Sequence, residues 1–270
     1  MWLPSYAGRS ERVIRTLVVG FATLVLIFLL SPLLVVIPLS FSSEPFFTFP
    51  IPGLSLRWYR DFFANERWIT SLANSVAVGI PSMLLATVLG TMAALGLSRP
   101  SFPWRNAVTA ALISPMIIPI VIVAVGAYLF FGRLGLVNTR LGLVLAHTAL
   151  AIPFVVITVR ATLAGHDRNL DRAAASLGAP PLDAFRRVTL PLILPGVVSG
   201  AIFAFATSFD EVVVALFLTA AEQRTLPVQM FSGIRDQINP TIMAAATMLF
   251  ALSISLFLVA TSLVARAQRR

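Results

Sequence analysis

The chain has 270 residues, of which 58% are hydrophobic and 11% are charged. Soluble domains carry about a quarter charged residues, so this composition excludes an ordinary globular protein of an aqueous compartment. A net charge of +9 would suit nucleic acid in a soluble protein, but in a membrane protein a basic excess reports topology, and we expect membrane lipid and no nucleic acid as a partner.

The residue types that are missing exclude several kinds of chemistry. All 20 basic residues are arginine, and there is no cysteine. The chain therefore has no lysine-bearing phosphate loop, no disulfide, no thiolate metal site and no cysteine nucleophile. Motifs such as H-E-x-x-H and G-x-S-x-G do not occur either, which argues against an intramembrane enzyme. We predict that this chain contributes no catalytic residue, no metal ligand and no cofactor-binding residue.

Long apolar runs predict an all-α, polytopic membrane protein with six transmembrane helices, because about 20 helical residues cross the hydrocarbon core. The runs cover residues 13–39, 69–97, 107–131, 141–159, 192–219 and 242–265. Arginines precede the first run as in a signal peptide, but the run is too long for one, and we predict a retained span. Pro115, Pro119 and Pro153 can kink the spans that contain them.

The arginines of the loops predict the orientation in the membrane. Thirteen of them fall on the side that holds both chain ends, and seven fall on the other side. Cytoplasmic loops carry the excess of basic residues, so we predict that both termini are cytoplasmic. The external loop at residues 41–68 is rich in proline and in aromatic residues such as Trp58, which suits an anchor in the headgroup zone more than a ligand site.

A stretch of charged and turn-forming residues, 170–195, interrupts the apolar runs on the predicted cytoplasmic side. Asp167 or Asn169 can cap a short helix there. The apolar residues that share one face of that helix are Leu170, Ala173, Ala174 and Leu177. Gly178 predicts the end of the helix, and Pro180 and Pro181 block its continuation. Such a small-residue helix could fit a groove on a partner protein, but spacing alone is equally consistent with a solvated loop.

The run RAAASLGAPPLDAFRRVTLPLILPG makes this stretch more specific. It resembles the EAA loop of bacterial ABC-importer permeases, and the resemblance extends over residues 70–266. The positions that match the loop pattern are Ala173, Ala174, Gly178, Leu190 and Pro191. Arg172 stands where the family has glutamate, with Asp171 just before it, and this departure affects one polar contact expected with the ATPase.

The resemblance implies the type I ABC-importer permease fold and a location in the inner membrane of a bacterium. Residues 1–68 would form the N-terminal tail, the first transmembrane helix and the external loop. Residues 69–266 would form the transmembrane domain, which has a five-helix core and a coupling loop at residues 160–191. The residues of the coupling loop that contact the ATPase would be Leu170, Asp171, Arg172, Ala173, Ala174, Leu177, Gly178 and Pro181.

The same resemblance implies three kinds of partner. Two ATPase subunits would bind ATP and Mg and hydrolyse the nucleotide, since this chain has no phosphate loop of its own. A second permease subunit, a different homologue, would form the other half of the pathway. An external solute-binding protein would deliver the cargo to the outer loops.

Two adjacent acidic residues, Asp210 and Glu211, lie in the fifth predicted span. A carboxylate at the bilayer centre costs about 2.5–3.5 kcal/mol on insertion scales, so such residues mark either a transport pathway or a structural pair. On one helix they would point about 100° apart and would not share a partner. With Phe205 and Phe209 they are the candidates for lining the pathway, because aromatic and anionic groups together suit a cationic amine.

The segments SFDEVVVALFL and RTLPVQMFSGIRDQINP are similar to the permeases of spermidine/putrescine importers, which implies a polyamine cargo. Two alternatives stay open, an importer permease for another small organic solute and a secondary carrier driven by an ion gradient. The carrier would use Asp210, Glu211 and His147, and it usually needs more spans or an inverted repeat, which is not evident. His147 fits a hydrogen bond between packed helices better than a proton relay.

Overall fold

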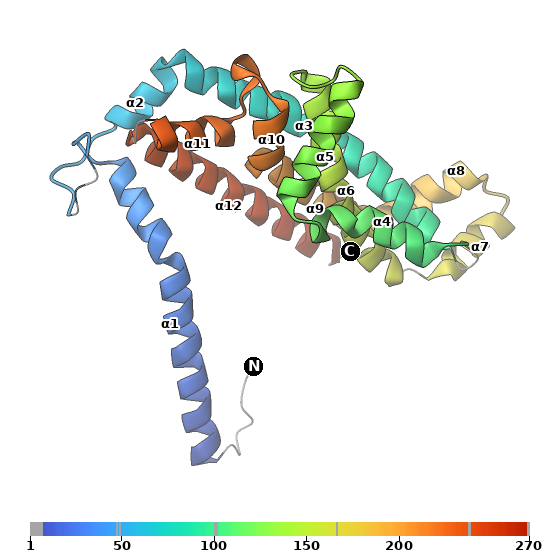
Figure 1. Ribbon diagram of the computed structural model, residues 1–270. Helices are drawn as coiled ribbons and strands as arrows, with labels where there is room; N and C mark the ends of the chain where they lie inside the picture. Colours follow the sequence, from blue (N-terminus) through green and yellow to red (C-terminus); the bar gives the residue numbers. More distant parts are fainter. Residues whose placement is uncertain are drawn as a thin grey trace. The chain divides into compact units, whose positions relative to one another are not determined.

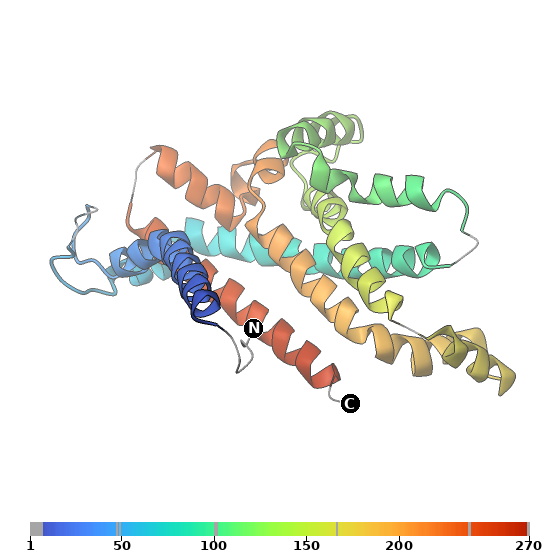
Figure 2. The ribbon, with the colours of Figure 1, turned by 90° about the horizontal axis from the view of Figure 1, so that it is seen from below.

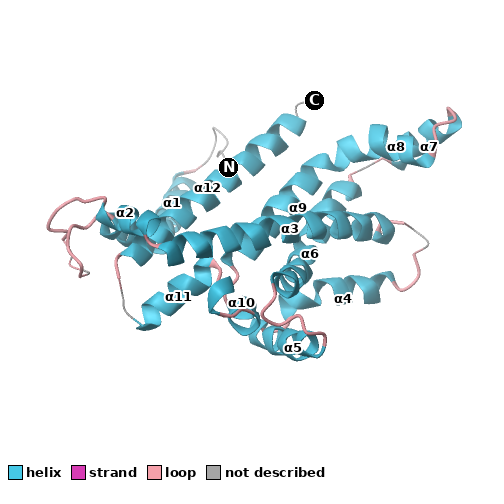
Figure 3. Ribbon diagram, turned by 90° about the horizontal axis from the view of Figure 1, so that it is seen from above, coloured by secondary structure: helices cyan, strands magenta, loops and turns pink. Residues whose placement is uncertain are grey.

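The computed structural model describes residues 8–46, 48, 50–99, 102–165, 167–236 and 239–268. Across these residues the structure consists of helices and loops without a β-strand, as Figure 3 shows, which confirms the predicted all-α class. Ser42 and Leu54 form an isolated antiparallel bridge in the loop after the first helix. The chain divides into two compact units, the first made of Met1–Ala64 and Ile238–Leu249 and the second of Asn65–Gln237 and Phe250–Arg270.

The first unit holds a long apolar helix and the loop that follows it. Helix α1 spans Arg9–Ser40 (Figure 1), and its Val13–Ser40 segment is long and apolar enough to cross a membrane. Most of this segment is exposed, and only its last residues, Leu39 and Ser40, are buried. Helix α2, Arg57–Ala64, lies in the predicted external loop. Trp58 is only 3% exposed, and its Nε1 donates to the carbonyl oxygen of Ser42 at 2.7 Å. This aromatic residue therefore helps to fold the loop.

Three helices form the centre of the second unit: α3, Glu66–Leu97; α6, Arg140–Ala164; and α9, Leu190–Asp210 (Figure 2). Helix α6 continues without a break through Pro153. Their buried contacts are made largely by small residues, among them Ala86, Ala94, Ala151 and Ala204. At Gly200 of α9 a Cβ atom would stand 2.6 Å from Thr158 Oγ1 of α6, so the close approach of these two helices requires glycine.

The third predicted span, residues 107–131, is not one continuous helix. It is divided into α4, Arg105–Ile117, and α5, Ile120–Arg133, which are bent by 105° relative to each other. Ile118 has extended dihedrals (φ −71°, ψ 136°), because a residue that precedes proline is pushed out of the α region, and Pro119 follows it. Within the residues that the structure describes, five helices are long and apolar enough to cross a membrane, and there are up to six if this bent pair counts as one span.

The fifth predicted span, residues 192–219, also ends earlier than expected. Helix α9 stops at Asp210, Glu211 is extended (φ −74°, ψ 123°), and a separate short helix α10 occupies Val213–Leu218. The turn η2, Ala221–Gln223, and helix α11, Leu226–Asp236, follow. The sixth predicted span lies within α12, Thr241–Gln268. The side chain of Glu211 explains the break, because it binds backbone N–H groups at the start of α10.

Candidate functional site

The charged stretch at residues 170–195 folds into three short elements at the end of α6 and the start of α9. They are α7, Arg168–Ser176; α8, Pro181–Ala184; and the π-helical turn η1, Phe185–Thr189, which runs directly into α9 (Figure 1). Asp167 is the residue that caps α7, since its Oδ1 accepts from the N–H of Asn169 at 2.9 Å. These three elements lie within residues 160–191, the coupling loop that the resemblance implies, and we keep that name for them.

Gly178 ends α7 as the sequence predicted. Its φ is +80°, in the left-handed region that favours glycine, and its N–H donates to Ala175 at 3.0 Å. The N–H of Ala179 donates to Ala174 at 3.1 Å, so two of the last free carbonyls of the helix are satisfied by a Schellman motif. A hydrogen bond of 2.9 Å from Thr189 Oγ1 to Asp171 Oδ1 then ties α7 to η1. These hydrogen bonds therefore fix where α7 ends and how it lies relative to η1.

Most of the predicted coupling residues are exposed. Leu177 is 89% exposed, Leu170 is 46% exposed and the neighbouring Leu182 is 57% exposed. Arg172, Ala173, Gly178 and Pro181 are exposed as well, whereas Asp171 and Ala174 are half-buried. Apolar side chains that stand free on a short, well-tied loop are typical of a surface that a partner covers.

Replacing Gly178 with valine should weaken the attachment of a partner to the coupling loop about tenfold, because a left-handed β-branched residue costs at least about 1–2 kcal/mol. A Cβ at this position meets nothing within 4 Å, so the conformation alone is tested. Gly178→Asn is the matched control, since asparagine tolerates positive φ. Co-purification of the partner at equal permease levels measures the effect, and equal loss in both variants would contradict it.

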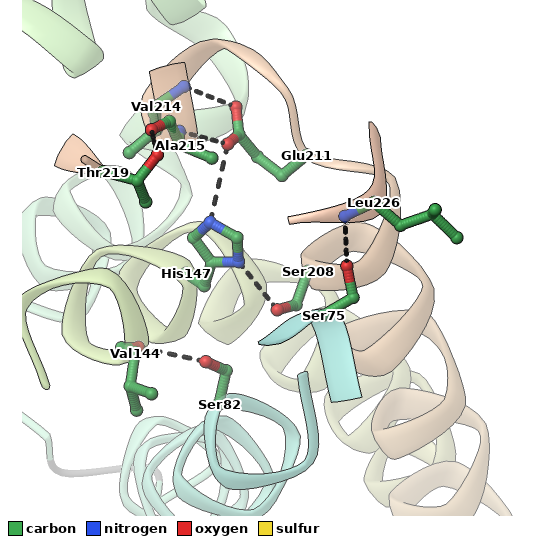
Figure 4. Close-up of polar contacts among 10 residues, drawn as sticks. All are labelled: Ser75, Ser82, Val144, His147, Ser208, Glu211, Val214, Ala215, Thr219 and Leu226. Atoms are coloured by element: carbon green, nitrogen blue, oxygen red, sulfur yellow. Dashed lines mark hydrogen bonds and ion pairs between the residues drawn. The ribbon is translucent and has the colours of Figure 1, made fainter. Parts of the chain in front are cut away.

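A buried polar cluster lies where α9 breaks (Figure 4). Glu211 Oε1 accepts from the N–H of Val214 and Oε2 from the N–H of Ala215, both at 2.8 Å. His147 of α6 lies between two partners, with Nε2 3.5 Å from Glu211 Oε2 and Nδ1 2.8 Å from Ser208 Oγ. Glu211 is 9% exposed and His147 is fully buried. The cluster therefore joins α6 to the α9–α10 break, and His147 makes a hydrogen bond between packed helices, as expected.

The four pathway candidates are not equivalent in the structure. Asp210 is exposed at the last position of α9, whereas Glu211 is buried in the polar cluster and points to α10. Phe209 is 6% exposed, and its ring stacks on Phe205 with centroids 5.1 Å apart. Both rings lie close to Gly79 of α3. Of the four, Asp210 is thus the one whose side chain is exposed.

Sequence reasoning missed the role of Ser208 and the break that gives Glu211 its role. The sequence did hold a signal for this role, because an acidic residue just before a helix often accepts a hydrogen bond from a backbone N–H in its first turn. An acidic residue in an apolar run can also mark a transport pathway. Among the residues that the structure describes, no three histidine and acidic side chains gather into a group that could hold a metal ion. The hydrogen bonds of Glu211 and His147 hold α6, α9 and α10 together at the break.

A polar cavity of about 410 Å³ was also not foreseen. It is lined by Glu66, Arg67, Thr70, Ser71, Ala221, Glu222, Arg224 and Gln229. Its walls are held together by Asn74, whose Nδ2 donates to the carbonyl oxygens of Glu222 at 3.0 Å and Arg224 at 3.2 Å. Arg140 in turn donates to Asn74 Oδ1 at 3.2 Å. The start of α3 and the η2 segment thus form one rigid rim.

Comparison with known proteins places these features in a family. Residues 86–270 match the family described as binding-protein-dependent transport system inner membrane component. The spermidine/putrescine transport system permease protein PotC of Haemophilus influenzae is 32% identical over 237 residues, which are 88% of this chain and 92% of that protein. The putrescine transport system permease protein PotI of Escherichia coli is 31% identical over 269 residues, which are 97% and 94% of the two chains.

The same similarity extends to a sugar permease and to solved structures. The trehalose transport system permease protein SugB of Mycobacterium tuberculosis is 31% identical over 237 residues, 85% of this chain and 83% of that protein. A bacterial ABC transporter for alginate import has a chain of the same fold, with a TM-score of 0.76, 17% identity and coverage of 96% of this chain and 99% of that one. The methionine transporter MetNI gives a TM-score of 0.58 at 22% identity, over 74% and 95% of the chains.

Proposed function

Because this chain belongs to the family of binding-protein-dependent transport system inner membrane components, the permeases of ABC importers, we propose that it forms half of the membrane pathway for a small cation, a polyamine such as spermidine or putrescine. The observation that carries the choice of cargo is the exposed carboxylate of Asp210 at the end of α9. Sequence identity alone would not select a polyamine as the cargo, since a trehalose permease is 31% identical to this chain.

Asp210 has the surroundings that an ammonium group needs. A carboxylate is the natural partner of an ammonium ion, and the same helix carries the half-buried ring of Phe205, which stacks on Phe209. The backbone at Asp210 is fixed, because the next residue, Glu211, binds α10 and His147. The acid is therefore held at the α9–α10 break by rigid structure on its C-terminal side.

The chain would work with four partners. A second permease subunit, a different homologue, would supply the other half of the pathway, and an external solute-binding protein would deliver the cargo. Two ATPase subunits would bind ATP and Mg and dock on the coupling residues Leu170–Gly178 and Pro181. Closure of the ATPase pair would draw the coupling loops together and rock the permease pair between outward and inward openings. This chain would form half of the moving membrane pathway and would catalyse no covalent reaction.

Asp210→Asn tests the proposal. Loss of a charge-assisted contact worth about 1.5–3 kcal/mol should lower uptake of radiolabelled spermidine about tenfold to a hundredfold, with normal amounts of protein in the membrane. Glu222→Gln is the control, because it neutralises another exposed carboxylate whose side chain lies away from α9. Unchanged uptake by Asp210→Asn would remove Asp210 from the pathway. Uptake by the permeases without ATPase subunits would instead favour an ion-driven carrier.

A further inference from the structure

The outward face of α7 differs from the apolar face that the sequence suggested. Asp171 and Ala174 are half-buried, so they mark the side of α7 that packs on the rest of the coupling loop. Each helical residue advances by about 100°, which places Asn169, Arg172, Ala173 and Ser176 on the opposite, outward side. All four are exposed. The face thus has small polar and apolar residues and one cation, and the C-cap residue Leu177 lies beside it.

The acidic groups next to Arg172 are already engaged within the coupling loop. Asp171 accepts the hydroxyl of Thr189, and Asp167 caps the N-terminus of α7. Arg172 is exposed, and its guanidinium carries five N–H donors that match a carboxylate in geometry. A partner that covers this face removes water from the guanidinium. Burial of an unpaired charge is unfavourable, so the covering surface needs an acidic group opposite Arg172.

Leu177 sets a second requirement on the same surface. At 89% exposure it projects almost wholly into solvent from the C-cap of α7. It follows Arg172 by five positions, so the two side chains lie about 140° apart around the helix and less than about 8 Å apart along it. A groove that receives the small residues between them would therefore meet a cation on one wall and a large apolar side chain on the other.

We propose, on the basis of the proposed function, that the ATPase subunit serving this permease has a docking cleft with a carboxylate that pairs with Arg172 and an apolar pocket for Leu177. Arg172 thereby selects the ATPase subunit with which the permease works. The partner is defined by this chemistry, an acidic and apolar groove that is wide enough for one short helix. The hydrogen bond of Asp171 and the Schellman motif at Gly178 hold α7 in place, so that Arg172 and Leu177 keep a fixed spacing.

Charge reversal at Arg172 tests this pairing in the complete transporter. With the permease pair in lipid nanodiscs and its purified ATPase subunit as the probe, Arg172→Glu should raise the Kd at least about tenfold at low salt. The effect should shrink at high salt, because counterions screen the new repulsion. Arg172→Gln should give a smaller rise. The matched control is Arg133→Glu, which makes the same change of charge at an exposed position at the end of α5.

Complementary reversals then identify the carboxylate. Acidic residues of the ATPase cleft are changed to arginine one at a time, and one of them should restore the Kd of Arg172→Glu to near the native value. An unchanged Kd in Arg172→Glu overturns the inference, and so does a weakened complex that no reversal restores. Failure of the unmodified permease to bind the ATPase would be different, because it would overturn the proposed function itself.

Discussion

Replacing Glu211 with alanine should destabilise the protein more than the removal of any other single carboxylate. The change leaves the buried N–H groups of Val214 and Ala215 without their acceptor and removes the ionic partner of His147. Each buried group left unpaired costs about 1–3 kcal/mol. We therefore expect a loss of about 3–5 kcal/mol in the free energy of unfolding, which is typical of a broken buried network.

Thermal unfolding of the assembled transporter in detergent measures this effect, with the yield of folded protein as a second readout. Asp210→Ala is the matched control, because it removes the adjacent carboxylate, which is exposed. Its Tm should stay close to the native value. Glu211→Gln should lie between the two, since one amide oxygen can still accept while the amide nitrogen faces a backbone donor. A native Tm for Glu211→Ala would refute the structural role of the cluster.

The apolar runs alone located most of the helices that can cross a membrane. The predicted spans at residues 13–39, 69–97 and 141–159 fall within α1, α3 and α6, because uninterrupted hydrophobic sequence of that length has few other ways to fold in lipid. The end of α7 at Gly178 was also predictable, since only a residue that tolerates positive φ forms the Schellman motif there.

The two broken spans were beyond the reach of hydropathy. A count of apolar residues is the same for a straight helix and for one bent by 105° at Ile118 and Pro119. Proline indicates that a kink is possible there, but the angle depends on how α4 packs against α6 and α5 against α10. The break at Glu211 depends on backbone groups three and four residues ahead and on a histidine 64 positions away in sequence.

The candidate site was predicted in part for the same reason. Asp210 and Glu211 were recognised as costly charges, but their neighbours along the chain do not reveal which one is exposed. Their different roles follow from α6, which places His147 beside Glu211 and leaves Asp210 at the free end of α9. Which residues pair with each other is decided by the tertiary structure and not by the local sequence.

Replacing Gly200 with leucine should separate α9 from α6. A Cβ atom at this position would stand 2.6 Å from Thr158 Oγ1 and 3.0 Å from Val155 Cα. The threonine hydroxyl could rotate, but the second atom is backbone, so α6 itself would have to move. Overpacking of a tight interface costs about 1–3 kcal/mol, and at the upper end we expect the Tm of the purified transporter to fall by about 5–10 °C.

Gly96→Leu on α3 separates this steric effect from a change in helix propensity. Both substitutions replace a helical glycine with leucine, which by itself favours the helix by about 0.5–1 kcal/mol. A Cβ at Gly96 meets nothing within 4 Å, so this control should keep or slightly raise the native Tm. If the two variants had the same Tm, α6 and α9 would not approach closely at Gly200. A lower Tm for Gly200→Leu alone would show that close backbone contact holds α6 and α9 together. That contact is what holds Asp210 at a fixed position at the end of α9.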